Sequence, residues 1–165
     1  MEFRDVLQKR VSCRSYNGKP VSQEAISRIL NEMVLAPTAR HLQAYRVKVS
    51  TDVSFIEGVG KLAKQEERVK GASACMVFFA EKDEFFAIQD ATIVCAYAQM
   101  VATDEGLASL WMGVFDADGL KQLCGFTNND EAALLKLKPV SVLILGHTDV
   151  EMVRPERKGL KDILI

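Results

Sequence analysis

The sequence carries almost no net charge, because 21 basic residues offset 22 acidic ones over 165 residues. It therefore lacks the positive field that attracts nucleic acid or an anionic membrane, and we expect neither as a partner. It also lacks an unbroken apolar stretch of membrane-spanning length, and its opening residues, MEFRDVLQKR, lack the apolar core of a secretory signal. These absences predict a cytoplasmic protein.

The motifs of several enzyme classes are missing as well. The chain has no CxxC pair, and neither histidine lies at metal-ligand spacing from a cysteine, so we expect no metal site. It has no GxSxG, HExxH, P-loop or GxGxxG pattern, and no acid–base or nucleophile constellation is evident. Reduced structural thiols are the simplest interpretation of its four widely spaced cysteines. These are Cys13, Cys75, Cys95 and Cys124.

Helices and strands are predicted to alternate along the chain, with no linker or internal repeat, so we expect a single domain over residues 1–165. Ser22 is a predicted N-cap, and Pro37 is predicted to stop the helix that follows it. Two continuous apolar runs are typical of strands buried on both faces. The predicted helices cover residues 2–9, 23–36 and 52–67, and the predicted strands cover residues 45–50, 74–80 and 140–145.

The stretch AIQDATIVCAYAQMVATD, residues 87–104, is apolar around almost its whole circumference. A helix without a polar face is expected to be buried on every side. Two arrangements would bury it in a chain of this size. It could pack against a second copy of the chain in a homodimer, which we prefer, or lie deep in the core of a monomer.

Two arginines and a serine alternate in RVSCRSYNG, residues 10–18. In an extended chain the side chains of Arg10, Ser12 and Arg14 leave on one side, while Val11 and Cys13 face the other way. Guanidinium groups suit phosphate because their planar fork donates paired hydrogen bonds. The stretch is therefore a candidate phosphate clamp, and ordinary surface charge is the alternative.

Two further stretches are candidates for ligand contact. APTARHLQAYR, residues 36–46, joins a predicted helix to a predicted strand and is either a ligand-binding loop or a plain polar loop. GLASLWMGVFD, residues 106–116, contains Gly113, which could let the backbone approach a flat ligand closely. The alternative for this second stretch is a turn that lines the core.

The order and spacing of these stretches resemble the FMN-dependent nitroreductase family. RVSCRSY at residues 10–16 is similar to the family's opening arginine-serine motif. APTARHLQAY at residues 36–45 resembles its helix-ending A-P-S motif, and GLASLWMGVF at residues 106–115 resembles its G-L-x-S-x-W-x-G-x-F motif. The closing strand and glycine at residues 140–146 and the basic tail at residues 157–163 complete the likeness, which covers nearly the whole chain.

This resemblance implies an α+β fold, with a mixed central β-sheet flanked by helices, in an intertwined homodimer with FMN at the interface. It implies ping-pong hydride transfer through flavin N5, from NAD(P)H to a small-molecule electron acceptor such as a nitroaromatic or a quinone. Arg10, Ser12 and Arg157 would hold the FMN phosphate, and Arg14 would lie near the pyrimidine edge. The residues implied to bind FMN are Arg10, Ser12, Arg14, Thr38, Gln43, Gly113 and Arg157, with Thr38 and Gln43 contributed by the other subunit.

The chain departs from the family pattern at Val11, His41 and Ala44, and it is short between residue 80 and the apolar helix. Two other functions therefore remain open. The protein could be a non-enzymatic FMN carrier, or a dimeric interaction protein that has lost the flavin.

Overall fold

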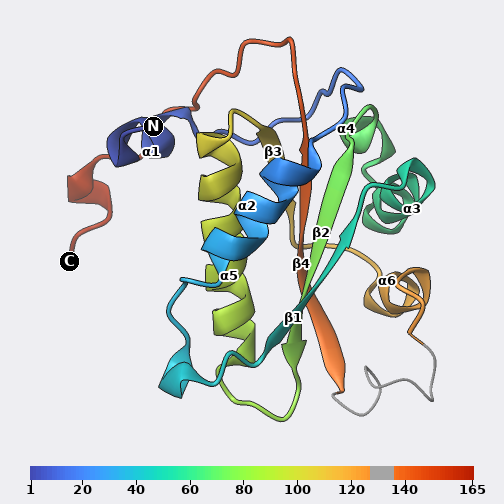
Figure 1. The fold of residues 1–165 in the computed structure, drawn as a ribbon. Helices are drawn as coiled ribbons and strands as arrows, with labels where there is room; N and C mark the ends of the chain where they lie inside the picture. Colours follow the sequence, from blue (N-terminus) through green and yellow to red (C-terminus); the bar gives the residue numbers. More distant parts are fainter. Residues whose placement is uncertain (127–135) are drawn as a thin grey trace.

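The computed structural model describes residues 1–126 and 136–165, and its centre is a four-stranded sheet in the order β1-β2-β4-β3 (Figure 1). All three pairings of neighbouring strands are antiparallel, so the expected mixed sheet is wrong for the described residues. Hydrophobic patterns locate strands but do not give their direction, and the sequence alone could not decide this point. The strands are β1 (Tyr45–Ser50), β2 (Ala74–Glu81), β3 (Ala108–Met112) and β4 (Leu137–Gly146).

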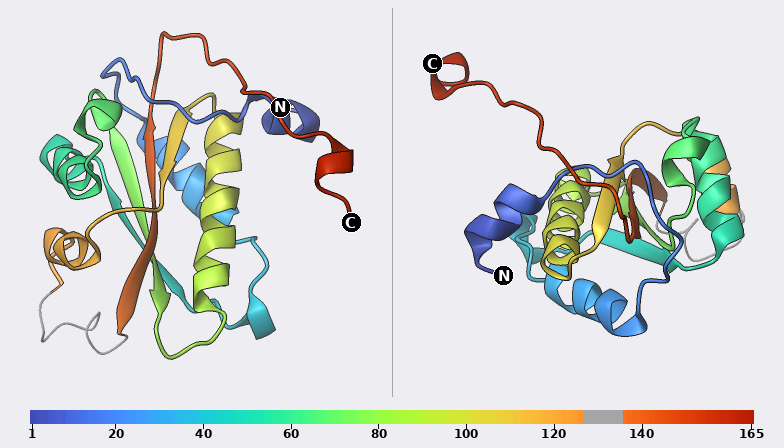
Figure 2. Two further views of the ribbon diagram at one scale, coloured as in Figure 1. Left: turned by 180° about the vertical axis from the view of Figure 1, so that it is seen from behind. Right: turned by 90° about the horizontal axis from the view of Figure 1, so that it is seen from above.

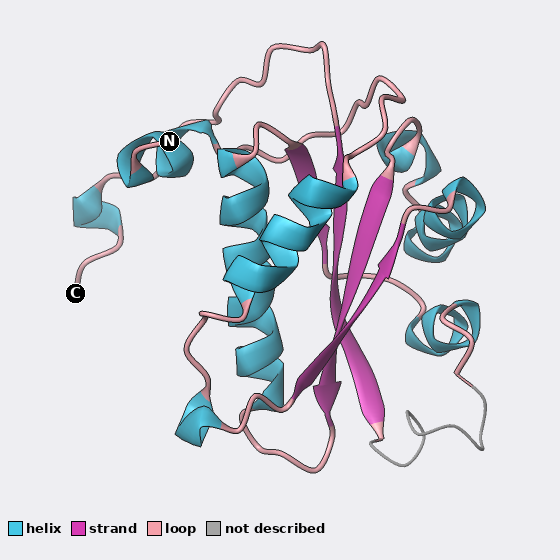
Figure 3. Ribbon diagram, viewed as in Figure 1, coloured by secondary structure: helices cyan, strands magenta, loops and turns pink. Residues whose placement is uncertain are grey.

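Helices cover both faces of the sheet (Figures 1 and 3). One side carries α1 (Phe3–Lys9), α2 (Gln23–Met33) and α5 (Ala87–Asp104), and the other carries α3 (Val53–Ala63), α4 (Glu66–Val69) and α6 (Ala117–Leu123). The α+β class is therefore confirmed. None of the helices in the described part of the chain is long and apolar enough to cross a membrane.

The central strands are buried on both faces, as their continuous apolar runs predict. In β2, Met76 and Phe78 pack with α2 and α5, whereas Val77 and Phe79 pack with α3 and α6. All four of these side chains are fully buried. The alternation follows from the two-residue period of a strand, and it divides the core into two layers with the sheet between them.

Two of the predicted helices are shorter in the structure. The Ser22 cap is confirmed, since its hydroxyl accepts a hydrogen bond from the Ala25 amide over 3.1 Å, but α2 ends at Met33, well before Pro37. The helix expected over 52–67 breaks at Lys64, whose φ of 54° is left-handed. The chain folds back there, and a Cβ on Gly60 would lie 2.5 Å from the Val69 side chain.

Helix α5 spans residues 87–104, as predicted, but it is not buried on every side within one protomer. Its inner face packs on the sheet and on α2, and residues such as Val94 are fully buried. Its outer face leaves Ile88, Ile93 and Tyr97 exposed by 45%, 36% and 37%. The interpretation as a helix deep in a monomer core is therefore wrong, and one chain leaves an apolar helix face uncovered.

Candidate functional site

The arginine segment, residues 10–14, runs as an extended chain beside β3. Ser12 forms an isolated parallel bridge with Ser109, and the Cys13 amide donates a hydrogen bond to the Ser109 carbonyl over 2.7 Å. Cys13 is buried and Arg14 is exposed, as the alternation predicts. The arginine segment therefore has the extended conformation on which the clamp hypothesis depends.

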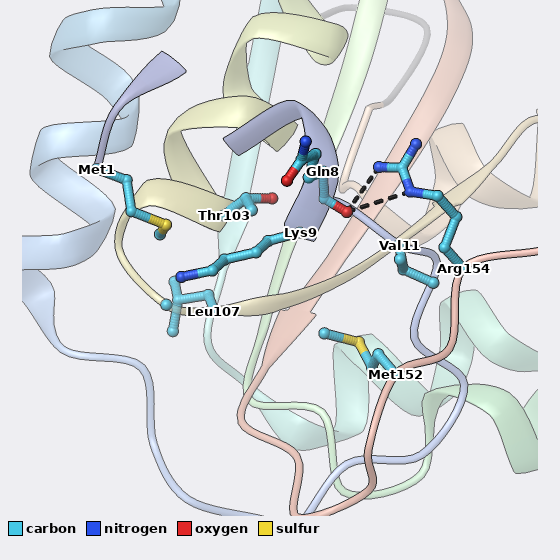
Figure 4. A pocket seen from close by; sticks show the side chains of 9 residues that line it. Met1, Gln8, Lys9, Val11, Thr103, Leu107, Met152 and Arg154 are labelled. Atoms are coloured by element: carbon cyan, nitrogen blue, oxygen red, sulfur yellow. Dashed lines mark hydrogen bonds between the residues drawn. The ribbon is translucent and has the colours of Figure 1, made fainter. Parts of the chain in front are cut away.

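Val11 lines two neighbouring cavities. The first has a volume of about 440 Å³ and lies between α1, the end of α5 and the C-terminal segment (Figure 4). The second, of about 230 Å³, is lined by residues 11–15 and 150–153, so Ser12 and Arg14 share its wall. Val11 lines both cavities, so this side chain lies next to the candidate clamp.

Arg10, Arg154 and Arg157 lie close together where the arginine segment meets the C-terminal segment, residues 147–165. The Arg154 guanidinium donates to the carbonyls of Leu7 and Gln8 in the last turn of α1, the contact to Gln8 being drawn in Figure 4. Partial burial of Arg10, together with the nearby positive charges of Arg154 and Arg157, lowers the pKa of Arg10 from its ordinary value.

Arg10, Arg154 and Arg157 form a positive cluster. None of the ion pairs of the described residues involves any of these three arginines. Guanidinium groups held together without a carboxylate repel one another, and a bound anion would relieve that repulsion. The Ser12 hydroxyl on the same segment adds a neutral donor, so the donor set fits a phosphate group.

The loop at residues 38–43 contains the short helix η1 (Ala39–His41) and three non-glycine residues in the left-handed region. The φ angles of Arg40, His41 and Gln43 are 51°, 56° and 51°. Inside the loop, the Gln43 amide donates to the Thr38 hydroxyl over 3.3 Å. The loop is also bound to α5, because the Ala39 amide donates a hydrogen bond to the Asp90 carboxylate over 2.9 Å.

The arginine segment and this loop lie at opposite ends of α5 in one protomer. Asp90, which binds the loop, is in the first turn of α5, and Thr103, which lines the first cavity, is in its last turn. Thirteen residues of helix between them correspond to a rise of about 20 Å. The structure therefore brings Arg10, Ser12, Arg14 and Arg157 to one region and leaves Thr38 and Gln43 in another.

Gly113 directly follows β3, the strand beside which the arginine segment runs. Residues 108–112 of the stretch 106–116 form β3, so this part is a strand that lines the core and not a turn. A Cβ on Gly113 would meet no atom within 4 Å, so this backbone faces open space. The site remains accessible to a flat ligand at this point.

Three further residues organise the two ends of α5, and the sequence gives only weak signals for them. Arg154 is a basic residue three positions before Arg157. Asp90 and Gln99 are polar interruptions of an apolar helix, and a buried polar side chain in such a helix generally has a partner. In the described part of the chain, no three His, Cys, Asp or Glu side chains are grouped to hold a metal ion.

Comparisons with known proteins agree with this geometry. The model of the "Nitroreductase family" matches residues 7–80 and 62–147. Over 99% of its length the chain is 23% identical to a protein of Methanothermobacter thermautotrophicus, named "Putative NADH dehydrogenase/NAD(P)H nitroreductase", of which it covers 83%.

Solved structures show the same fold. A nitroreductase family protein from Clostridium difficile superposes with a TM-score of 0.84 at 26% identity, over 100% of this chain and 98% of that one. An FMN-dependent nitroreductase from Clostridium difficile superposes with a TM-score of 0.79 at 22% identity, over 95% and 92% of the two chains. The family match extends from the arginine segment to the end of β4, and this chain belongs to the nitroreductase family.

Proposed function

We propose that this protein is an FMN-dependent NAD(P)H oxidoreductase that reduces nitroaromatics, quinones or similar flat electrophiles. The observation that carries the proposal is the uncompensated positive cluster of Arg10 and Arg157 beside Ser12. A relative named as an NAD(P)H nitroreductase and a structural neighbour named as FMN-dependent support it. The cluster supplies the charge-assisted donors that a phosphate with nearly two negative charges needs.

The residues of the site would bind and orient the cofactor rather than carry out the chemistry themselves. Arg10, Arg157 and Ser12 would hold the phosphate, while Gly113 would let the backbone lie close to the flat ring system. Arg14 would place a positive charge near the pyrimidine edge and stabilise negative charge there. Bound FMN would supply the hydride chemistry, in which NAD(P)H and the acceptor use the same open face in turn, a ping-pong order.

We propose that the active form is a homodimer. The loop with Thr38 and Gln43 lies too far along α5 to share a ligand with Arg10 in the same protomer. A second copy packed on the exposed apolar face of α5 would bring its own loop toward the arginine segment and bury a surface that soluble monomers rarely expose. The residues after β4 leave the body as an extended segment that could reach a partner (Figure 2).

A visible absorption spectrum of the purified protein, followed by anaerobic addition of NADH or NADPH, tests this function. We expect flavin bands that bleach on addition of one of the two nucleotides. Flavin bands that do not bleach would identify an FMN carrier. A colourless protein that does not take up added FMN would identify an interaction protein without flavin.

A further inference from the structure

Asp90 is a buried carboxylate with a specific partner in the loop at residues 38–43. Its side chain lies in the first turn of α5 and the residue is 3% exposed. A carboxylate oxygen accepts a hydrogen bond from the Ala39 backbone amide over 2.9 Å. Burial of a charged group is costly unless the group is hydrogen-bonded, so this carboxylate depends on donors such as the Ala39 amide. The first turn of a helix is also a favourable place for its charge.

Among the described residues, the hydrogen bond to Asp90 is the only one that joins the loop to another part of the chain. In the described residues, every other hydrogen bond made by residues 38–43 stays within residues 38–45. The side chains from Arg40 to Gln43 are exposed, so apolar burial contributes little to holding the loop. Removing the Asp90 carboxylate would therefore release the loop from α5.

The loop has a conformation that requires such an anchor. Arg40, His41 and Gln43 all have positive φ angles, which cost free energy for residues with a Cβ. Strained residues of this kind persist where the surrounding structure determines them, and they are common in ligand-binding loops. Without the anchor, the loop would relax toward ordinary backbone conformations and move Thr38 and Gln43.

We propose that Asp90 is a positioning residue that holds the loop in the conformation in which Thr38 and Gln43 contact FMN across the dimer interface. This inference rests on the proposed function, because the loop is assigned to FMN there. Helix α5 would then both pack against the second protomer and hold the loop in place through Asp90. Asp90 itself touches neither the cofactor nor the substrate, and it acts through the Ala39 amide.

The test compares Asp90→Ala with Asp90→Asn, which keeps an oxygen acceptor for the Ala39 amide. We measure FMN affinity by titration of the apo-protein. We also measure the rate at which trypsin cuts the Arg40–His41 bond without FMN, with the fragments identified by mass. Asp90→Ala is expected to weaken FMN binding by about 10-fold to 100-fold and to accelerate this cut. Asp90→Asn is expected to stay close to wild type in both measurements.

Ser22→Ala is the matched control, because it removes a hydrogen bond of similar kind, from the Ala25 amide at the start of α2, away from the loop. It should lower thermal stability while leaving FMN affinity and the Arg40–His41 cut unchanged. If Asp90→Ala does not fold, Ala39→Pro removes the donor of the same bond and takes its place, since proline is tolerated at the first position of a helix.

Three results would overturn the proposal. Asp90→Ala could bind FMN like wild type, Asp90→Asn could be as weak as Asp90→Ala, or Ser22→Ala could lose as much affinity at an equal loss of stability. A wild-type protein that binds no FMN would instead contradict the proposed function. The proteolysis result would then still decide whether Asp90 orders the loop.

Discussion

The side-chain amide of Gln99 donates a hydrogen bond to the hydroxyl of Ser109 over 3.1 Å, and both side chains are buried. This contact joins α5 to β3 within the core. The carbonyl of the same Ser109 accepts the hydrogen bond from the Cys13 amide. Helix α5 is therefore connected through β3 to the arginine segment, just as Asp90 connects it to the loop at residues 38–43.

Replacing Gln99 by leucine should destabilise the protein, because the Ser109 hydroxyl would stay buried without its partner. We expect a loss of about 1–3 kcal/mol in the free energy of unfolding, measured by urea denaturation. The double variant Gln99→Leu/Ser109→Ala removes both polar groups and should recover part of that loss. Strictly additive effects of the two single changes would show that the two side chains are not coupled in solution.

Replacing Arg10 by alanine should weaken FMN binding while the fold is retained, because Arg10 makes no ion pair among the described residues that would be lost. Removal of one charge-assisted contact costs about 1.5–3 kcal/mol, or roughly 10-fold to 150-fold in affinity. Titration of the apo-protein with FMN measures the effect.

Arg68→Ala provides the control for charge, since Arg68 is exposed on α4 at the other face of the sheet. Val11→Ala is less suitable, because Val11 lines both cavities. Equal affinities for Arg10→Ala and wild type would mean that the arginine segment is ordinary surface charge.

Much of the fold could be predicted from the sequence because the signals are local. The Ser22 cap and the apolar run of β2 each depend on residues within a few positions of one another. The break at Lys64 could not be predicted in the same way, because it depends on Val69 packing over Gly60 after the chain reverses. Strand direction was missed for a related reason, since it depends on connections rather than on composition.

The candidate site likewise has a part that local sequence predicts and a part that only tertiary structure reveals. The alternation of Arg10, Ser12 and Arg14 is a local pattern, and the structure shows the extended segment that this pattern requires. The proximity of Arg154 and Arg157 to Arg10 joins residues more than 140 positions apart, and only the tertiary structure shows it. The separation of Thr38 from Arg10 likewise becomes visible only when α5 is placed between them.

Gly113→Ala should leave the apo-protein folded and weaken FMN binding. The added methyl group would meet no atom within 4 Å, and the φ of Gly113 is not in the left-handed region, so the unfolding free energy should fall little or even rise. A flat ring lying against this backbone would meet the methyl group directly. Thermal denaturation and FMN titration separate the two effects, and an unchanged affinity would place the flavin ring elsewhere.

Ile93→Glu should convert a homodimer into monomers and, in doing so, reduce FMN binding. Ile93 and Tyr97 are one helical turn apart on the exposed face of α5, and a carboxylate buried there against a second copy would lack a partner. Wild-type protein at low micromolar concentration should sediment at about twice the chain mass of 18.3 kDa, and the variant at about one chain mass.

Val53→Glu is the control for the added charge, because Val53 is 59% exposed at the start of α3, on the other face of the sheet. This variant should remain dimeric and bind FMN like wild type. Because Thr38 and Gln43 lie about 20 Å along α5 from the arginine segment, loss of the dimer should remove the cofactor contacts of both residues together. A monomeric Ile93→Glu protein that binds FMN with full affinity would show that a single chain completes the site.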